Sequence, residues 1–135
     1  MNELRAQLSA TNVQTTGTTY EDALASFYNK DYQRGISQFK SLVNTTSTEL
    51  RDNSQYWIGE CYYGLKQYRQ ALNAFEKVFN FKGTDKYDDA QLKLGYCYKQ
   101  LNDNSRAVAE FERLIQYYPE SEYRNIALNQ ISILD

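Results

Sequence analysis

The sequence of 135 residues contains no histidine, a single proline and only two cysteines. Without histidine, a serine or cysteine nucleophile would need a lysine or a carboxylate as its base, and a metal site would lack its commonest nitrogen ligand. The sequence also has no glycine-rich phosphate loop and no nucleophile elbow. Because no convergent catalytic set is present, we predict a non-enzymatic protein without metal or cofactor.

Long apolar runs and clustered positive charge are also missing. No stretch of about eighteen apolar residues occurs, so we expect no direct insertion into a membrane. The formal net charge is -2, and lysine and arginine alternate with acidic residues along the chain. A protein that binds nucleic acid usually carries a basic stripe, so we expect no nucleic-acid partner.

The first 19 residues differ from the rest. Met1–Leu8 is polar and lacks the apolar core of a secretory signal, which would fit a cytoplasmic protein if the chain were complete. Leu4 and Leu8 instead fit the last turns of an upstream helix or coiled coil, and residues 9–19 are rich in threonine, serine and glycine. We therefore expect residues 1–19 to be a linker or the end of an upstream coiled coil, and the chain to be a fragment.

Residues 53–78 contain two amphipathic helices joined by a short turn at Gly64–Gln67. In the first helix, Ile58, Gly59 and Tyr62 share one face. A glycine in the middle of a helix lowers its stability, so Gly59 predicts the close approach of another backbone. In the second helix, the apolar stripe has i, i+4, i+7 spacing and contains Ala71, Phe75 and Val78.

The same pattern recurs at a fixed period of 36 residues, the distance from Gly59 to Gly95. The later copy repeats the second-helix stripe as Ala107, Phe111 and Leu114, and the earlier copy has Gly35, Phe39 and Leu42. The first helix of the earlier copy has Ala23 at the glycine position. Self-similarity at a fixed period is typical of a tandem helical repeat.

The combination of a large apolar residue, glycine and tyrosine, followed by alanine, an aromatic residue and Pro119, resembles the tetratricopeptide repeat. We therefore predict an all-α solenoid, with three helix-turn-helix repeats at about 16–51, 52–87 and 88–123, within a domain of residues 20–135. A final helix, residues 122–134, should cap the open end of the stack, with Ser121 as its N-cap. The alternative is an unrelated helical bundle.

Cys61 and Cys97 occupy the same position in successive repeats. Stacked helices lie about 8–10 Å apart, which exceeds the Cα separation that a disulfide tolerates. We therefore expect two small buried thiols rather than a disulfide or a redox pair.

The candidate binding site is a concave groove lined by the first helix of each repeat. Tyrosine offers a large apolar surface with a polar tip, which suits recognition of an extended or helical peptide. The alternative is that some of these rings fold inward against neighbouring helices. The groove residues that we predict are Tyr20, Leu24, Phe27, Asn53, Tyr56, Glu60, Tyr63, Asp89, Leu92, Tyr96, Lys99, Asn125 and Leu128.

Three segments resemble a particular family more closely. Residues 55–63 (QYWIGECYY), 90–96 (AQLKLGY) and 118–122 (YPESE) are similar to segments of the periplasmic Tol-Pal-associated tetratricopeptide proteins, the cell division coordinators. The similarity covers about residues 20–133. The first two repeat junctions depart from that family because they lack its tyrosine-proline pair.

This resemblance implies a periplasmic adaptor in cell division that binds Tol-Pal envelope components. In that family a trimerising coiled coil precedes the repeats, which implies a homo-oligomer formed through upstream residues. Two alternatives remain open. The repeats could be a structural or oligomerisation block without a bound peptide. They could also be a scaffold of the outer-membrane assembly type, because the outer-membrane assembly lipoprotein contains similar sequence segments.

Overall fold

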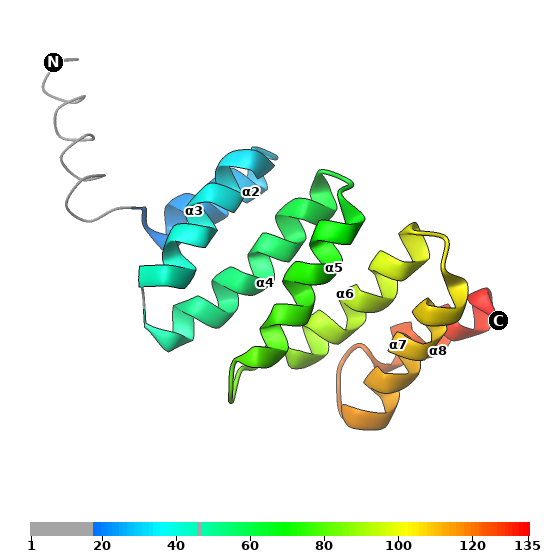
Figure 1. Cartoon of the computed structure of the whole chain (residues 1–135). Helices are drawn as coiled ribbons and strands as arrows, with labels where there is room; N and C mark the ends of the chain where they lie inside the picture. The colour runs from blue at the N-terminus through cyan, green and yellow to red at the C-terminus, as the bar shows by residue number, and fades with distance from the viewer. Residues whose placement is uncertain (1–17, 46) are drawn as a thin grey trace, which may run out of the picture.

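The computed structural model describes residues 18–45 and 47–135, without the side chains of residues 48 and 49 (Figure 1). Most of the linker predicted at residues 1–19 therefore lies outside the described residues. Every regular element in the described part is helical, and α5 continues directly into the short 3-10 helix η1. The elements are α2 (Tyr20–Tyr28), α3 (Tyr32–Thr45), α4 (Thr48–Gly64), α5 (Tyr68–Glu76), η1 (Lys77–Asn80), α6 (Tyr87–Gln100), α7 (Asn104–Tyr117) and α8 (Arg124–Leu134).

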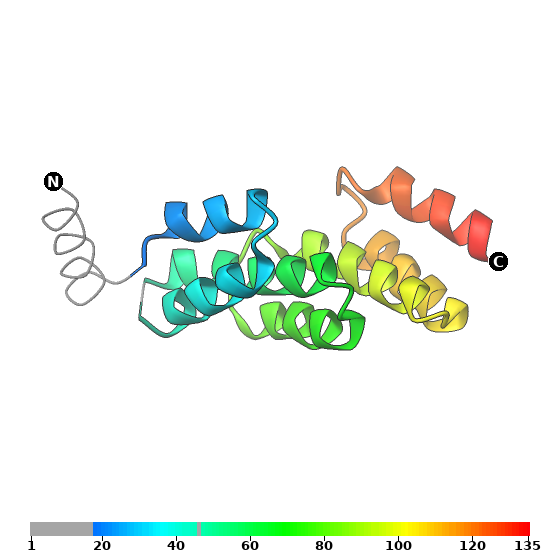
Figure 2. The ribbon, with the colours of Figure 1, turned by 90° about the horizontal axis from the view of Figure 1, so that it is seen from above.

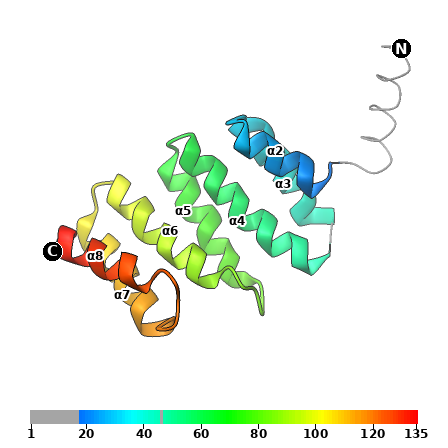
Figure 3. The ribbon, with the colours of Figure 1, turned by 180° about the vertical axis from the view of Figure 1, so that it is seen from behind.

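The helices form two layers. Helices α3, α5 and α7 make the second-helix layer, which faces the viewer in Figure 1, and α2, α4, α6 and α8 make the first-helix layer, which is seen from behind in Figure 3. From above, α2 and α8 rise at the two ends over α4 and α6, so the first-helix side is concave (Figure 2). This arrangement confirms the predicted all-α solenoid.

The same buried residues recur in all three repeats. The aromatic position in the middle of each second helix has no solvent exposure, and the small and aliphatic positions on either side of it are buried as well. Full burial of a large aromatic side chain contributes about 1.5–3 kcal/mol to stability. Because these buried residues recur every 36 positions, the sequence period reflects the repeating core. The residues are Gly35, Ala71 and Ala107, then Phe39, Phe75 and Phe111, and finally Leu42, Val78 and Leu114.

The turns within the three repeats share one geometry that the sequence analysis did not identify. Lys30, Lys66 and Asn102, again 36 residues apart, have positive φ angles of 63°, 62° and 62°. In the central turn, the Lys66 N–H donates to Tyr63 at 2.9 Å and the Gln67 N–H donates to Tyr62 at 2.9 Å. This pair of bonds is a Schellman motif, which satisfies the last carbonyls of a helix. The outer two turns make the same two bonds.

The mid-helix glycines make room for a ring rather than for a backbone. A Cβ atom at Gly59 would lie 2.5 Å from the ring of Phe75, and one at Gly95 would lie 2.4 Å from the ring of Phe111. The prediction of a close backbone neighbour was therefore wrong, although the close approach itself is present. Each glycine accepts the buried phenylalanine of the second helix in its own repeat.

Helix α8 caps the stack with a shift of one residue. Its backbone begins at Arg124, 37 residues after Tyr87, and its buried positions follow the same offset, with Ala127 in the place of Ala90. The N-cap residue is Tyr123 rather than the predicted Ser121. The Ser121 hydroxyl instead accepts the Tyr123 N–H at 3.0 Å and donates to Asp88 at 2.6 Å, which fixes the turn before the helix.

Both cysteines are free and completely buried, as predicted. Burial raises the pKa of Cys61 and of Cys97 to about 12. A thiol with such a pKa carries almost no thiolate at neutral pH and is a poor nucleophile. The two cysteines therefore act as small apolar core residues.

Candidate functional site

The concave side of the stack, which we call the first-helix face, is built from two junctions and the cap. The first junction is the place where α4 of the second repeat follows the first repeat. The second junction is the place where α6 of the third repeat follows the second repeat. The same helical positions face the groove at both junctions, but their side chains differ in kind.

Aromatic rings fill the first junction. The Trp57 ring lies 4.9 Å from Phe27 and 6.2 Å from Tyr28, both edge to face, and is stacked 6.3 Å from Phe39. The Trp57 indole N–H also donates to the Tyr20 hydroxyl. Aromatic pairs in this geometry add about 0.5–1.5 kcal/mol each beyond the area they bury. The first junction is therefore a packed cluster, from which Tyr28 projects with 67% of its surface exposed.

Charge dominates the second junction. The Lys93 ammonium lies 3.2 Å from the Glu60 carboxylate and also lies over two rings, 5.5 Å from the centroid of Tyr63 and 5.8 Å from that of Tyr96. The Tyr63 hydroxyl accepts a hydrogen bond from Gln100 at 3.4 Å. A cation held between aromatic faces is attracted by their quadrupoles. Glu60 and Lys93 thus form the charged centre of the first-helix face.

Burial changes the ionisation of this centre. Burial raises the pKa of Glu60 above that of a free glutamate, and Lys93 opposes the rise. The Tyr56 hydroxyl donates to the Glu60 carboxylate, and burial raises the pKa of Tyr56 so that it stays a neutral donor. Partly desolvated charges of this kind are common in recognition sites, although structural ion pairs show them as well.

The cap is tied to the third repeat by polar bonds along the same face. The Tyr123 hydroxyl donates to the Asp89 carboxylate at 2.6 Å, and the Lys99 ammonium donates to Gln130 at 2.8 Å. The hydrogen bond to Asp89 raises the pKa of Tyr123, which therefore remains a donor. Burial raises the pKa of Asp89, while the Tyr123 bond opposes the rise.

Two of the predicted groove residues are not displayed. Tyr56 and Leu92 are only 7% and 6% exposed, and both belong to hydrophobic core clusters. The expectation that they line an exposed groove was wrong because their rows turn toward the second helix of the same repeat. The alternative of inward-folded rings therefore applies to Tyr56, which lies 5.5 Å from Phe75.

The other predicted groove residues retain some exposure. Those on α2, α4 and α6 are half-buried, while the two on α8 are exposed. Together the half-buried residues are Tyr20, Leu24, Phe27, Asn53, Glu60, Tyr63, Asp89, Tyr96 and Lys99, and the exposed ones are Asn125 and Leu128.

Sequence reasoning missed four residues of this face. Lys93 and Trp57 were left out although they are 36 residues apart and therefore equivalent. The one-residue shift of α8 makes Ile126 and Ile133, rather than Asn125, the counterparts of Asp89 and Tyr96. These two isoleucines are 40% and 62% exposed. The spacing of seven residues between Ile126 and Ile133, equal to that between Asp89 and Tyr96, was the sequence signal that could have identified these two.

Within the residues that the structure describes, no group of three or more histidine, cysteine, aspartate and glutamate side chains is arranged to hold a metal ion. None of the described helices is long and apolar enough to cross a membrane.

Comparison with known families agrees with this fold. The family model of the tetratricopeptide repeat matches residues 53–80 and 89–121, which lie in the second and third repeats. No curated protein sequence matches the chain. The fold is thus a tetratricopeptide-repeat solenoid, and the first repeat, which the family model does not cover, has the same core positions as the other two.

Tetratricopeptide repeats generally mediate protein–protein interactions, and the fold is typically not catalytic. A protein partner is accordingly the class of ligand that the repeats suggest. The first-helix face, with its half-buried tyrosines and its charged centre, offers both apolar area and orienting polar groups.

Proposed function

We propose that this chain is a non-enzymatic binding module that holds a peptide or helix of a protein partner against the first-helix face. The observation that carries the proposal is the Glu60 and Lys93 pair, set between the rings of Tyr63 and Tyr96. Partly buried charges surrounded by aromatic area orient a bound chain, because a partner must present complementary groups or leave these charges unpaired.

The partner that we propose is an envelope protein of the Tol-Pal system, with the chain acting as a periplasmic adaptor in cell division. The proposal is supported by the amino-acid sequences of residues 55–63, 90–96 and 118–122, which resemble segments of the cell division coordinators. Two of these segments supply the proposed site: residues 55–63 contain Glu60 and Tyr63, and residues 90–96 contain Lys93 and Tyr96.

The test is a pull-down from envelope extract with quantitative mass spectrometry, using two matched variants. The first variant, Glu60→Lys with Lys93→Glu, keeps the ion pair but reverses its direction on the first-helix face. The control, Arg34→Glu with Glu76→Arg, makes the same exchange of charge at two exposed residues of the second-helix layer. Both variants keep the net charge, and circular dichroism checks that both remain folded.

We expect the first variant to lose at least about 90% of the captured partner and the control to retain it, since a reversed pair faces the wrong charges. Retention by both variants would contradict the first-helix face as the binding site. If the lost partner is not a Tol-Pal component, the binding module stands and the envelope assignment fails.

A second candidate function is suggested by α8. Ile126 and Ile133, seven residues apart on one face of the helix, are exposed by 40% and 62%, and an apolar pair of this kind can pack against another domain or another copy of the chain. In that case Ile126→Lys with Ile133→Lys would change the sedimentation coefficient of the assembly. An unchanged sedimentation coefficient would remove this candidate.

A further inference from the structure

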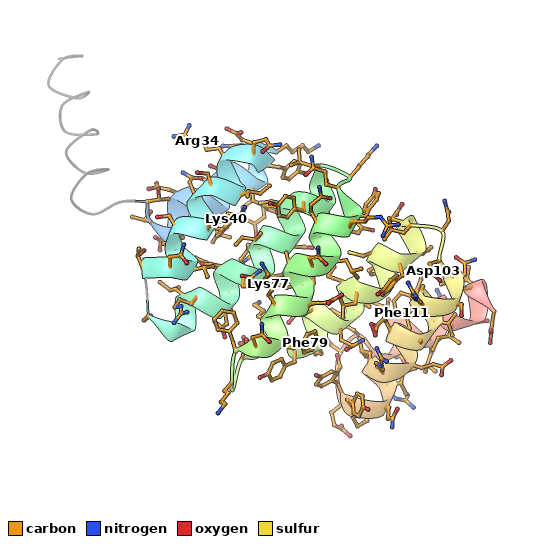
Figure 4. The ribbon with its side chains drawn as sticks, in the orientation of Figure 1. Arg34, Lys40, Lys77, Phe79, Asp103 and Phe111 are labelled. Carbon is orange, nitrogen blue, oxygen red and sulfur yellow. The ribbon has the colours of Figure 1, made fainter. Side chains whose placement is uncertain are left out.

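A second hollow lies on the opposite side of the molecule, in the second-helix layer. Residues of α3, α4 and α5, together with Lys77 of η1, enclose a cavity of about 420 Å³, which we call the first outer groove. Its lining combines apolar side chains, among them Ile58 and Ala74, with several amide side chains, and it includes Lys40 and Lys77. Figure 4 shows both lysines on this face of the molecule.

The repeat provides an internal comparison for this cavity. The second outer groove, about 400 Å³ between α5 and α7, is lined by residues 36 positions later, so each wall can be compared side chain by side chain. Both grooves contain a glutamine that makes the same hydrogen bond to the backbone. Gln55 donates to the carbonyl of Ala74 at 3.0 Å, and Gln91 donates to the carbonyl of Glu110 at 2.9 Å.

The charges of the two grooves are opposite. In the second outer groove, the counterparts of Lys40 and Ala74 are Glu76 and Glu110. The Glu110 carboxylate pairs with Arg113 and accepts a hydrogen bond from Gln91 at 3.4 Å. In that groove, Glu110 therefore has a cation of the same groove as its partner.

The first outer groove leaves its charges unsatisfied. Ala74 offers no carboxylate where Glu110 stands, and neither Lys40 nor Lys77 forms an ion pair with any residue in the described ranges 18–45 and 47–135. Helix α3 contains no acidic residue. The Lys40 ammonium extends over the ring of Tyr62, 5.8 Å from its centroid, and so projects over the groove wall. The cavity thus has two lysines without an acidic partner beside a few apolar side chains.

We propose that the first outer groove binds an acidic segment of a protein partner, with a glutamate or aspartate between the two lysines and a neighbouring aliphatic side chain against Ile58 and Ala74. The charge complementarity comes from the molecule itself, since the equivalent groove has a glutamate of its own, Glu110, at the position of Ala74. A carboxylate between the two lysines would gain charge-assisted hydrogen bonds, and the aliphatic side chain adds its burial.

The test is fluorescence anisotropy with a fluorescein-labelled hexapeptide of alternating leucine and glutamate, measured at 50 and 150 mM salt. The matched control peptide has glutamine in place of every glutamate. We expect the glutamate peptide to bind at least about 10-fold more tightly than the glutamine peptide, and its affinity to fall with salt because exposed charges are screened.

Two variants assign the binding to this groove. Ala74→Glu introduces the side chain that the second outer groove has at this position, and Lys40→Gln with Lys77→Gln removes the cations at exposed positions without altering the core. Each should weaken peptide binding at least about 10-fold, whereas Glu60→Lys with Lys93→Glu on the opposite face should leave it unchanged. Circular dichroism separates loss of binding from loss of folding, and the lysine variant carries the test if Ala74→Glu unfolds.

A graft gives the most demanding result. Glu76→Lys, Glu110→Ala and Arg113→Lys copy the first groove onto the second, and the number of peptides bound per chain should rise from one to two. Three results would each overturn the proposal. They are equal binding of both peptides, peptide binding that the lysine variant does not weaken, and displacement of the labelled peptide by inorganic phosphate at the concentration at which unlabelled glutamate peptide displaces it.

Discussion

The two repeat junctions differ most clearly at one position. Trp57 at the first junction and Lys93 at the second are equivalent residues, 36 positions apart on the same row of the first helix. Trp57 packs against the ring of Phe27, and Lys93 extends over Tyr63, the residue equivalent to Phe27. One junction therefore buries an aromatic ring where the other holds an ion pair.

The comparison separates what the repeat needs from what each junction adds. Both junctions keep the buried phenylalanine, the small residue beside it and the left-handed turn, because these define the period. The row that faces the groove is free to vary, because its side chains are only partly buried. We interpret the aromatic junction as the stabilising one and the charged junction as the one that recognises a partner.

The largest expected difference between the junctions is in stability. Trp57→Ala should lower the free energy of unfolding by about 3 kcal/mol, because it removes the centre of an aromatic cluster. Lys93→Ala should lower it by less, about 1–2 kcal/mol, because it leaves the largely buried Glu60 carboxylate without its partner but removes no packed ring. Urea denaturation of both variants measures the difference, and equal losses would contradict the assignment of separate roles to the two junctions.

A smaller loss of stability should be the same in the second and third repeats. Gln55 and Gln91 are buried and each bonds to the backbone of the second helix in its own repeat. Gln55→Ala and Gln91→Ala should each cost about 1–2 kcal/mol, the usual range for a buried hydrogen bond. If the losses of unfolding free energy in the two variants differ by more than about 1 kcal/mol, the two repeats are not equivalent even in their shared positions.

Part of the dependence of stability on pH should come from the second junction. Burial raises the pKa of Glu60 in the folded protein, so the folded state binds this proton more tightly than the unfolded state. Stability from this group is therefore full at low pH and is lost as the pH rises from the ordinary glutamate pKa through the raised one. Glu60→Gln should flatten this part of the profile.

Lys93→Gln provides the opposite control for the pH profile. Without the lysine that lowers it, the pKa of Glu60 should rise further, and the loss of stability should extend to higher pH. Unfolding free energies between about pH 4 and 8 test both variants. A profile that is identical in wild type and Glu60→Gln would show that Glu60 does not titrate differently on folding.

The smallest effect concerns the turns that all repeats share. Lys30→Gly and Lys66→Gly should each stabilise the protein by about 0.5–1 kcal/mol, because glycine adopts a positive φ without steric cost. Asn102→Gly should gain less, since asparagine tolerates this conformation. Thermal unfolding measures the gains, and destabilisation by Lys66→Gly would mean that the lysine makes a contact that outweighs the strain.

The fold was predictable because its information is periodic. The spacing of Phe39, Phe75 and Phe111 gave the repeat, and the Gly59 and Gly95 positions gave the crossing points, although the sequence could not show that each glycine faces a ring. Propensity also did not reveal the left-handed turns at Lys30 and Lys66, because lysine is not a residue that signals a positive φ.

The site was predictable only in outline. A helical period assigns a row of residues to one side, but the boundary between groove and core falls within that row, so Tyr56 and Leu92 turned out to be buried. The one-residue shift of α8 likewise follows from the length of the preceding turn and moves Ile126 into the place expected for Asn125. Lys93 was missed because its partner, Glu60, is distant in sequence.

Photo-crosslinking tests the central claim, partner binding on the first-helix face of the second junction, most directly. Benzoylphenylalanine is introduced at Tyr96, beside Lys93, or at Tyr117, an exposed residue of α7 in the other layer, in cells that produce the protein in its native compartment. We predict a specific crosslinked partner from position 96 and none from position 117. Equal products from both positions, or products from position 117 alone, would contradict a binding role for this face.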